Sequence, residues 1–256
     1  MNQVHRPIHR PIRAIKSFTL RGGKLTQGQQ RALQELWPAY GLSLDELANE
    51  RADFQQIFRR AAPTILEIGF GDGKALFEAA RKNPHQNFIG VEVHRPGIGH
   101  LLIQIHRYNL TNVKLFCADA INVLNTAIRA QSLAKICLFF PDPWPKKKHH
   151  KRRIVQPPFI DLVANKLKPG GIFHYATDWR DYADEAMGKL ELSSALVNIA
   201  GRGNFSPGPQ QRPETKFEKR GRRLGHGVWD IVMQKNNQSS HSCHHPDYTA
   251  NRNNFI

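Results

Sequence analysis

The sequence has few cysteines and no long apolar stretch, and each absence argues against a class of protein. Its longest uninterrupted apolar run is residues 136–140, whereas a membrane-spanning helix needs roughly 20 apolar residues. The first 18 residues contain no apolar segment of a secretory signal, and Pro7 and Pro11 disfavour the amphipathic helix of an organelle transit peptide, which the arginine-rich start otherwise leaves open. Only three cysteines occur in 256 residues, without a CxxC pair. Such sparse cysteine is typical of the reducing cytoplasm, so we expect a cytoplasmic protein without a membrane span.

Acidic residues are missing where basic residues are dense. Residues 1–31 contain seven basic residues and no acidic one, residues 146–153 contain six basic residues, and residues 212–223 contain six with two glutamates. These three segments carry a charge of +17 and the other 205 residues carry −1, which together give the +16 of the chain. A charge that served only solubility would be spread over the surface, so this clustering predicts a polyanion as partner.

The middle of the chain alternates between short apolar segments and amphipathic ones. Alternation of this kind is typical of βαβ units, in which a mostly parallel sheet has helices on both faces. We therefore expect one α/β domain over residues 26–235, preceded by a basic arm, residues 1–25, and followed by a polar, disordered tail, residues 236–256. Strands are expected at residues 64–68, 88–93, 113–117, 134–140, 172–176 and 227–234.

The polar tail contains a short cluster of residues that could suggest a metal site. His241, Cys243, His244 and His245 lie within five residues of one another. Ligands so crowded cannot close a tetrahedron well, and structural zinc sites usually have a folded frame. We therefore expect no metal.

The first expected strand leads into a glycine-rich turn. Gly69, Gly71 and Gly73 allow positive φ angles and let a ligand approach the backbone closely, although such a turn can also be only a tight connection. A dinucleotide fingerprint would need a glycine at the position of Lys74. The spacing therefore disfavours a ligand whose pyrophosphate sits at the helix N-terminus.

Carboxylates follow the next two strands, at the edge where parallel sheets bind ligands. Glu92 is placed to accept from ribose hydroxyls, and Asp119 could accept from an adenine amino group. Either residue alone is also a common helix N-cap. Both together, after a glycine-rich turn, describe a nucleoside pocket without a phosphate site, which is what S-adenosylmethionine needs.

The fourth strand leads into the segment PDPWPKKKHHKRR, residues 141–153. Its three prolines favour an extended loop that holds Asp142 and Trp144 at the rim of the same pocket, and its cations suit a phosphate backbone. Stacking on a base and packing beneath the loop are equally compatible with Trp144. The fifth strand leads into Thr177 and Asp178, which places another carboxylate at this edge.

Six motifs together resemble one enzyme family: EIGFGDG, GVEVH, FFPDPWPKKKHHKRR, ATDW, RPETKFEKRG and LGHGVWD. Over roughly residues 17–234 the chain is similar to the bacterial tRNA (guanine-N7-)-methyltransferases, which are class I enzymes dependent on S-adenosylmethionine. The resemblance implies a Rossmann-like, mostly parallel seven-stranded sheet. It also implies methyl transfer to N7 of a guanosine in tRNA, expected at position 46 of the variable loop, to form N7-methylguanosine. Monomer and homodimer are both compatible with the sequence.

The resemblance also implies roles for individual residues, with Asp142 as the catalytic carboxylate. The positions that match cofactor-binding residues are Glu67, Gly69, Gly71, Gly73, Glu92, Asp119 and Asp142. The positions that match substrate-binding residues are Lys146, Asp178, Thr215, Lys216, Phe217 and Glu218. The stretch that matches RNA contacts is Lys148, His149, His150, Lys151, Arg152 and Arg153.

Two other functions compete with this interpretation. Methyltransferases that act on exocyclic amino groups use an Asn/Asp-Pro-Pro-aromatic motif, and here Asp142 is followed by Pro143 and Trp144, one proline short. A non-enzymatic RNA-binding protein could retain the fold, but the acidic residues after the strands argue against that.

Overall fold

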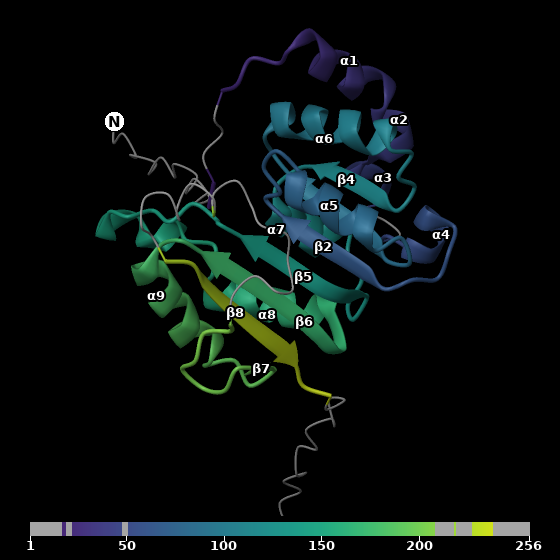
Figure 1. Cartoon of the computed structure of the whole chain (residues 1–256). Helices are drawn as coiled ribbons and strands as arrows, with labels where there is room; N and C mark the ends of the chain where they lie inside the picture. Colours follow the sequence, from purple (N-terminus) through teal and green to yellow (C-terminus); the bar gives the residue numbers. More distant parts are fainter. Residues whose placement is uncertain (1–16, 19–21, 48–50, 208–217, 219–226, 238–256) are drawn as a thin grey trace, which may run out of the picture.

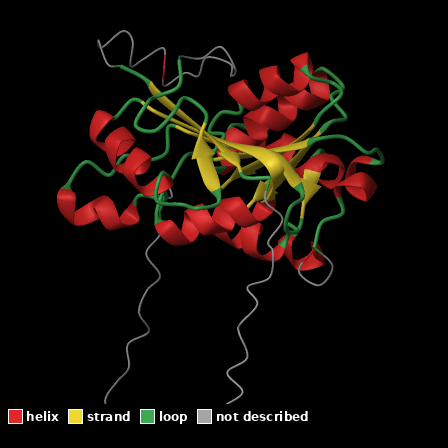
Figure 2. Ribbon diagram, turned by 90° about the horizontal axis from the view of Figure 1, so that it is seen from below, coloured by secondary structure: helices red, strands yellow, loops and turns green. Residues whose placement is uncertain are grey.

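The computed structural model describes residues 17–18, 22–47, 51–207, 218 and 227–237. Within them, one eight-stranded sheet lies between two sets of helices (Figures 1 and 2). The strand order is β1-β4-β3-β2-β5-β6-β8-β7, and β8 is antiparallel to both of its neighbours while the other described pairs are parallel. The strands are β1 Gly41–Leu42, β2 Thr64–Ile68, β3 Asn87–Glu92, β4 Val113–Cys117, β5 Leu133–Phe139, β6 Leu167–Thr177, β7 Leu196–Asn198 and β8 Trp229–Lys235.

Helices separate the strands as the alternating pattern predicts. No helix among the described residues is both long enough and apolar enough to cross a bilayer. The expected arm and tail fall largely outside the described residues. The helices are α1 Gln27–Glu35, α2 Trp37–Tyr40, α3 Leu44–Leu47, α4 Phe54–Phe58, α5 Lys74–Lys82, α6 Arg95–Arg107, α7 Ala120–Thr126, the 3₁₀ helix η1 Lys147–Arg152, α8 Pro157–Lys166 and α9 Arg180–Leu190.

The expected count of seven strands is one too low, and one strand is longer than predicted. The additional strand is β1, whose two residues pair with β4 at the edge of the sheet and are too short for a periodic pattern. β6 begins at Leu167 because residues 169–171 remain in the strand, where Gly170 adopts φ +72° and the register with β5 shifts. This Pro-Gly-Gly segment predicts a turn, and it forms an irregularity within the strand instead.

Two apolar clusters hold the helices against the sheet. One contains buried residues of α5 and α6 with β3 and β4, and α1 packs on the outer side of α6 (Figure 1). The other contains buried residues of α7, α8 and α9 with the centre of the sheet. Leu101, Leu102 and Ile105 on α6 are fully buried, as expected of one apolar helix face.

The topology creates a switch point at the centre of the sheet. The chain proceeds from β2 outward through β3 to β4, and it then resumes on the other side of β2 with β5 and β6. Loops that leave β2 and β5 therefore diverge at their carboxyl ends. Ligands of open α/β sheets bind at such a position.

Candidate active site

The predicted acidic residues lie along one edge of the sheet. Glu92 at the end of β3 is paired with Cys117 at the end of β4, and Phe139 at the end of β5 is paired with Ala176 in β6. Neighbouring strands lie about 4.8 Å apart, so β4 to β6 spans about 19 Å. In sheet order, the predicted residues at or after these ends are Asp119, Glu92, Gly69 to Gly73, Asp142 and Asp178.

The three glycines of the turn after β2 have different tasks. Gly69, Gly71 and Gly73 adopt φ angles of +69°, +60° and +77°, which other residues rarely adopt. A Cβ atom at Gly69 or Gly71 would have no atom within 4 Å, whereas one at Gly73 would lie 2.7 Å from Leu101 of α6. The first two glycines therefore border open space that a ligand could occupy, and the third permits helix packing.

Glu92 braces this turn. Its Oε2 accepts a hydrogen bond from the Gly71 N–H at 2.9 Å, and its Oε1 accepts from the N–H groups of Val93 and His94 at 2.7 and 3.0 Å. A carboxylate offers about four lone-pair sites, so these bonds leave capacity for a further donor such as a hydroxyl. The half-buried carboxylate thus orders the loop as well as facing the site.

Gly97, which lies outside the sequence motifs, is part of the same arrangement. It lies in the first turn of α6, and a Cβ atom there would overlap the carbonyl oxygen of Gly71. Only glycine lets α6 approach the turn so closely. A glycine inside a helical pattern is the one sequence signal that could have indicated it.

Glu67 is a buried carboxyl group beneath the site. It lies in β2 between Gly90 and Cys137 of the neighbouring strands and is 6% exposed. Burial raises the pKa of Glu67 to about 8, with Lys135 lowering it and the nearby Asp72 and Glu92 raising it. Because the charged form is disfavoured, this carboxyl is mostly protonated at neutral pH.

Asp119 serves as the N-cap of α7. Its Oδ1 accepts from the N–H groups of Ile121 and Asn122 at 2.8 and 3.3 Å. The cap orients a half-exposed carboxylate at the end of β4. Asp119 therefore has a structural role, and its cofactor contact stays a prediction.

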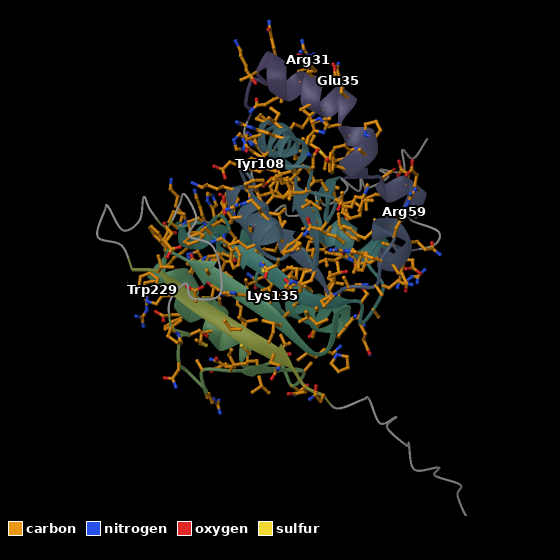
Figure 3. The ribbon with its side chains drawn as sticks, turned by 45° about the vertical axis from the view of Figure 1, so that its right-hand side comes forward. Arg31, Glu35, Arg59, Tyr108, Lys135 and Trp229 are labelled. Atoms are coloured by element: carbon orange, nitrogen blue, oxygen red, sulfur yellow. The ribbon has the colours of Figure 1, made fainter. Side chains whose placement is uncertain are left out.

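The loop after β5 departs from the sheet with strained backbone at two residues. Phe140 and Trp144 have φ angles of +51° and +45°, which are uncommon for side chains of this size. The Phe140 N–H still donates to the Ala176 carbonyl of β6 at 2.7 Å, and Asp142 follows two residues later. Asp142 is half-buried. Trp229 of β8 pairs with Thr177 at the carboxyl end of β6, and Figure 3 shows it on the opposite side of the molecule from Arg59.

Trp144 is held inside the loop. Its indole Nε1 donates to the Ser17 carbonyl at 3.1 Å, the Arg152 guanidinium lies 3.9 Å from its ring centroid, and the His149 ring packs edge-on at 5.9 Å. Of the two roles that the sequence leaves open, this environment favours packing within the loop over stacking on a base.

The basic stretch presents most, but not all, of its charges to solvent. Lys146, Lys147, Lys148 and Lys151 are exposed, and Arg152 is half-buried against Trp144. Loss of hydration and the surrounding cations lower the pKa of His149. The exposed lysines form the surface that a polyanion could contact; we call Lys146, Lys147, Lys148, Lys151 and Arg152 the cationic loop.

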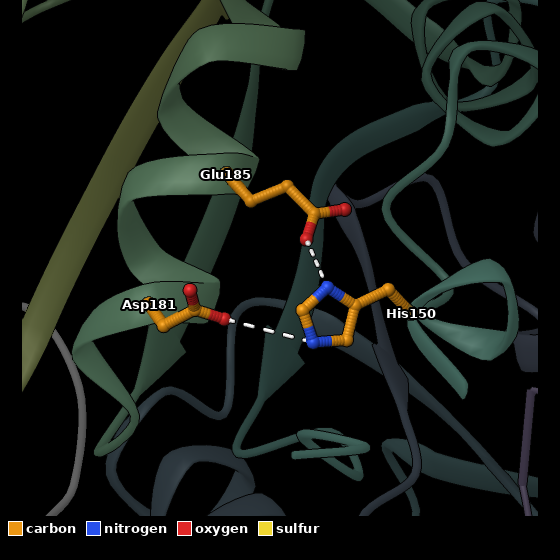
Figure 4. Close-up of side chains that lie close together, drawn as sticks. All are labelled: His150, Asp181 and Glu185. Atoms are coloured by element: carbon orange, nitrogen blue, oxygen red, sulfur yellow. Dashed lines mark ion pairs between the residues drawn. The ribbon is translucent and has the colours of Figure 1, made fainter. Parts of the chain in front are cut away.

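Arg153 differs from the rest of the basic stretch. Its side chain is fully buried and pairs with Asp181 and Glu185 of α9, so it presents no surface to RNA in this structure, which argues against the expected RNA contact. His150 lies beside the same two carboxylates, at 3.9 Å from Asp181 and 3.7 Å from Glu185 (Figure 4). His150, Asp181 and Glu185 have metal-ligand chemistry, but the carboxylate oxygens that face the histidine are those already bound by the Arg153 guanidinium. A nearby guanidinium disfavours a cation there.

The predicted substrate-binding residues are only partly described. Lys146 is exposed at the start of the cationic loop, and Asp178 is half-buried directly after β6. Glu218 is fully buried. Thr215, Lys216 and Phe217 lie outside the described residues.

Comparison with known proteins finds close relatives that share one name. A family model described as "Putative methyltransferase" matches residues 61–231. A protein of Alcanivorax borkumensis named tRNA (guanine-N(7)-)-methyltransferase is 50% identical over 225 residues, which are 88% of this chain and 92% of that protein. A protein of the same name from Hydrogenovibrio crunogenus is 52% identical over 223 residues, covering 87% and 92%.

A solved structure shares the fold at much lower sequence identity. The crystal structure of the 16S rRNA methyltransferase KamB is 18% identical with a TM-score of 0.50, and the match covers 73% of this chain and 95% of that chain. This likeness confirms the Rossmann-like class I fold. With half of its residues identical to the two named relatives over most of its length, the chain belongs to the tRNA (guanine-N(7)-)-methyltransferase family.

Proposed function

We propose that the protein transfers a methyl group from S-adenosylmethionine to N7 of a guanosine in tRNA, at position 46 of the variable loop, forming N7-methylguanosine. The observation that carries this proposal is the row of carboxylates at one sheet edge, directly beside an exposed cationic loop. The row suits a nucleoside and a base, and the loop suits a phosphate backbone. The sparse cysteines fit the reducing cytoplasm as the compartment.

The half of the edge formed by β2, β3 and β4 fits the cofactor. The open space over Gly69 and Gly71 admits a ligand against the backbone, while Glu92 and Asp119 supply acceptors for hydroxyl and amino groups. When bound, S-adenosylmethionine supplies an electrophilic methyl group on a sulfonium sulfur. Glu67 in β2 is a buried carboxyl group close enough to Asp72 and Glu92 for their charges to raise its pKa.

The half formed by β5 and β6 fits the guanine. N7 of guanine has a free lone pair, so no side chain must remove a proton before attack, and catalysis depends on positioning and electrostatics. Asp142 and Asp178 would accept from the N1–H and N2–H₂ edge of the base, and Lys146 or Thr215 would donate to O6. Because positive charge moves onto the guanine during transfer, a preorganised carboxylate there contributes about 3 kcal/mol.

The cationic loop would hold the tRNA over these carboxylates. The target base must leave its tertiary stack, which costs a few kcal/mol that backbone contacts can offset. The exposed lysines supply such contacts within the same loop as Asp142. Phosphate binding and base placement are thus coupled through one short segment.

The test is the substitution Asp142→Ala, compared with Asp161→Ala, an exposed aspartate on α8. Each protein is incubated with unmodified tRNA and labelled S-adenosylmethionine, the methylated nucleoside is identified, and cofactor affinity is measured by calorimetry. We expect Asp142→Ala to lower turnover by about 10²-fold while Asp161→Ala does not. Unchanged turnover in Asp142→Ala would refute its catalytic role, and a loss of cofactor affinity alone would make it a cofactor residue. A product other than N7-methylguanosine would refute the proposed reaction.

A further inference from the structure

Arg153 is the largest fully buried side chain among the described residues, although it ends a run of exposed cations. Each nitrogen of its guanidinium donates a hydrogen bond: Nε to the Pro143 carbonyl at 2.9 Å, Nη2 to Asp181 at 2.6 Å and Nη1 to Glu185. Its carbon lies 4.8 Å from the centroid of the Tyr182 ring. Three bonds in three directions use the planar fork of arginine, which lysine cannot reproduce.

The charges around this guanidinium are balanced. Asp181 and Glu185 are one turn apart on α9, and Lys189, a further turn along, pairs with Glu185. The bond from Arg153 helps hold the pKa of Asp181 below its ordinary value. A buried cation is stable only beside such partners. Asp181 and Glu185 lie 28 and 32 residues from Arg153 in the sequence, so the fold brings these three side chains together.

The contacts of Arg153 link the two segments that carry the carboxylates proposed to bind the base. Pro143 directly follows Asp142, and α9 begins two residues after Asp178. Backbone pairing between β5 and β6 ends with the Phe140 N–H, before Asp142. Beyond that point, the bond from Arg153 to Pro143 connects the loop to α9.

We propose that Arg153 is a positioning residue for methyl transfer: it fixes Pro143, and through it Asp142, relative to Asp178, and it makes no contact with tRNA. The inference rests on the proposed function, because it assigns a task within that same site. A displacement of about 1 Å in a reacting group can lower a rate by about 10²-fold. Loss of this tether should therefore reduce turnover rather than tRNA affinity.

The experiment compares Arg153→Met, Arg153→Lys and the double variant Arg153→Met with Glu185→Gln. Arg153→Met removes the tether and leaves Glu185 without its buried partner, so both turnover and melting temperature should fall. Removing the Glu185 charge in the double variant should restore melting temperature, but kcat should stay about 10- to 100-fold below wild type because Pro143 still lacks its hydrogen bond from Arg153. Arg153→Lys keeps the charge without the fork and should also lose turnover at saturating tRNA.

The dependence of tRNA affinity on salt distinguishes positioning from RNA contact. Each phosphate contact contributes roughly 0.7 to 0.9 to the slope of log K against log salt concentration. Lys151→Met should reduce the magnitude of this slope by the contribution of one contact. The Arg153 variants should keep the wild-type slope and the wild-type cofactor affinity. The measurement uses full-length protein and unmodified tRNA.

Four results would overturn the inference. They are wild-type kcat in Arg153→Met, joint recovery of melting temperature and kcat in the double variant, wild-type kcat in Arg153→Lys, and a salt slope in Arg153→Met reduced like that of Lys151→Met. The second would make Arg153 merely structural, and the last would make it an RNA contact. Absence of N7-methylguanosine with the wild-type protein overturns the proposed function and this inference together, whereas any of the four with an active wild type overturns the inference alone.

Discussion

Replacing Glu67 by glutamine should stabilise the protein, and the gain should increase as the pH rises. The pKa of this carboxyl is about 8 in the folded chain against an ordinary value of 4.5, because burial disfavours its charged form. Between these values the unfolded chain has released the proton while the folded chain still holds it, so stability falls as the pH rises. Glutamine has nearly the same shape and no charge to desolvate, which removes this dependence.

The two pKa values determine the size of the effect. Each unit between them corresponds to about 1.4 kcal/mol, so the penalty for Glu67 is about 1 kcal/mol at pH 5, about 3 kcal/mol at pH 7 and about 5 kcal/mol at pH 8.5. Urea unfolding of wild type and Glu67→Gln at these three pH values measures it. The matched control is Glu35→Gln, at an exposed glutamate on the outer face of α1 (Figure 3).

The effect of burial on Glu67 is measured by how the difference in free energy of unfolding between Glu67→Gln and wild type changes with pH. A constant offset between Glu67→Gln and wild type would reflect a change in packing or hydrogen bonding. If the difference in free energy of unfolding were the same at pH 5 and pH 8.5, the carboxyl would be ionised in the folded protein, and the attribution of its pKa to burial would be refuted. A difference that increased equally in Glu35→Gln would point to the global charge of the chain instead.

Two further predictions concern the glycine turn and the cationic loop. Gly97→Ala should destabilise the protein by about 1–3 kcal/mol and weaken cofactor binding at least tenfold, because the new Cβ atom would overlap the Gly71 carbonyl oxygen. The control is Gly188→Ala on α9, where a Cβ atom meets only open space and neither effect is expected. Calorimetry and thermal unfolding measure both effects, and equal behaviour of the two variants would contradict the steric reasoning. Lys151→Met should reduce the magnitude of the slope of log tRNA affinity against log salt concentration by roughly 0.7 to 0.9. Lys168→Met, at an exposed lysine near the start of β6, should leave this slope unchanged. Equal slopes in the two variants would contradict contact between the cationic loop and RNA.

The alternation of elements was predictable from sequence because burial on both faces demands near-continuous apolar strands. The expected strands at residues 64–68 and 113–117 are β2 and β4 to the residue, and the others agree within a few residues except for β6, whose start lies five residues earlier. Parallel pairing then dictates that residues following the strands meet at one edge. Glu92, Asp119, Asp142 and Asp178 could therefore be placed along one edge of the sheet from chain order alone.

Short elements and local irregularities were not predictable in this way. β1 and β7 have two and three residues, which is too few for a periodic pattern, and their partners lie far away in the sequence. Pro169 to Gly171 carry turn chemistry, yet tertiary pairing with β5 keeps them within a strand. In each case the deciding contact is long-range.

The environment of each charged side chain depends on contacts that form only in the folded chain. Arg152 and Arg153 are adjacent and chemically identical in the sequence, but one packs half-buried on Trp144 and the other is buried among carboxylates of α9. Chain order alone shows that cations follow Asp142. Which of them faces solvent depends on the distance to acidic groups more than 25 residues away, because burial of a charge is stable only where the fold supplies its counter-charges.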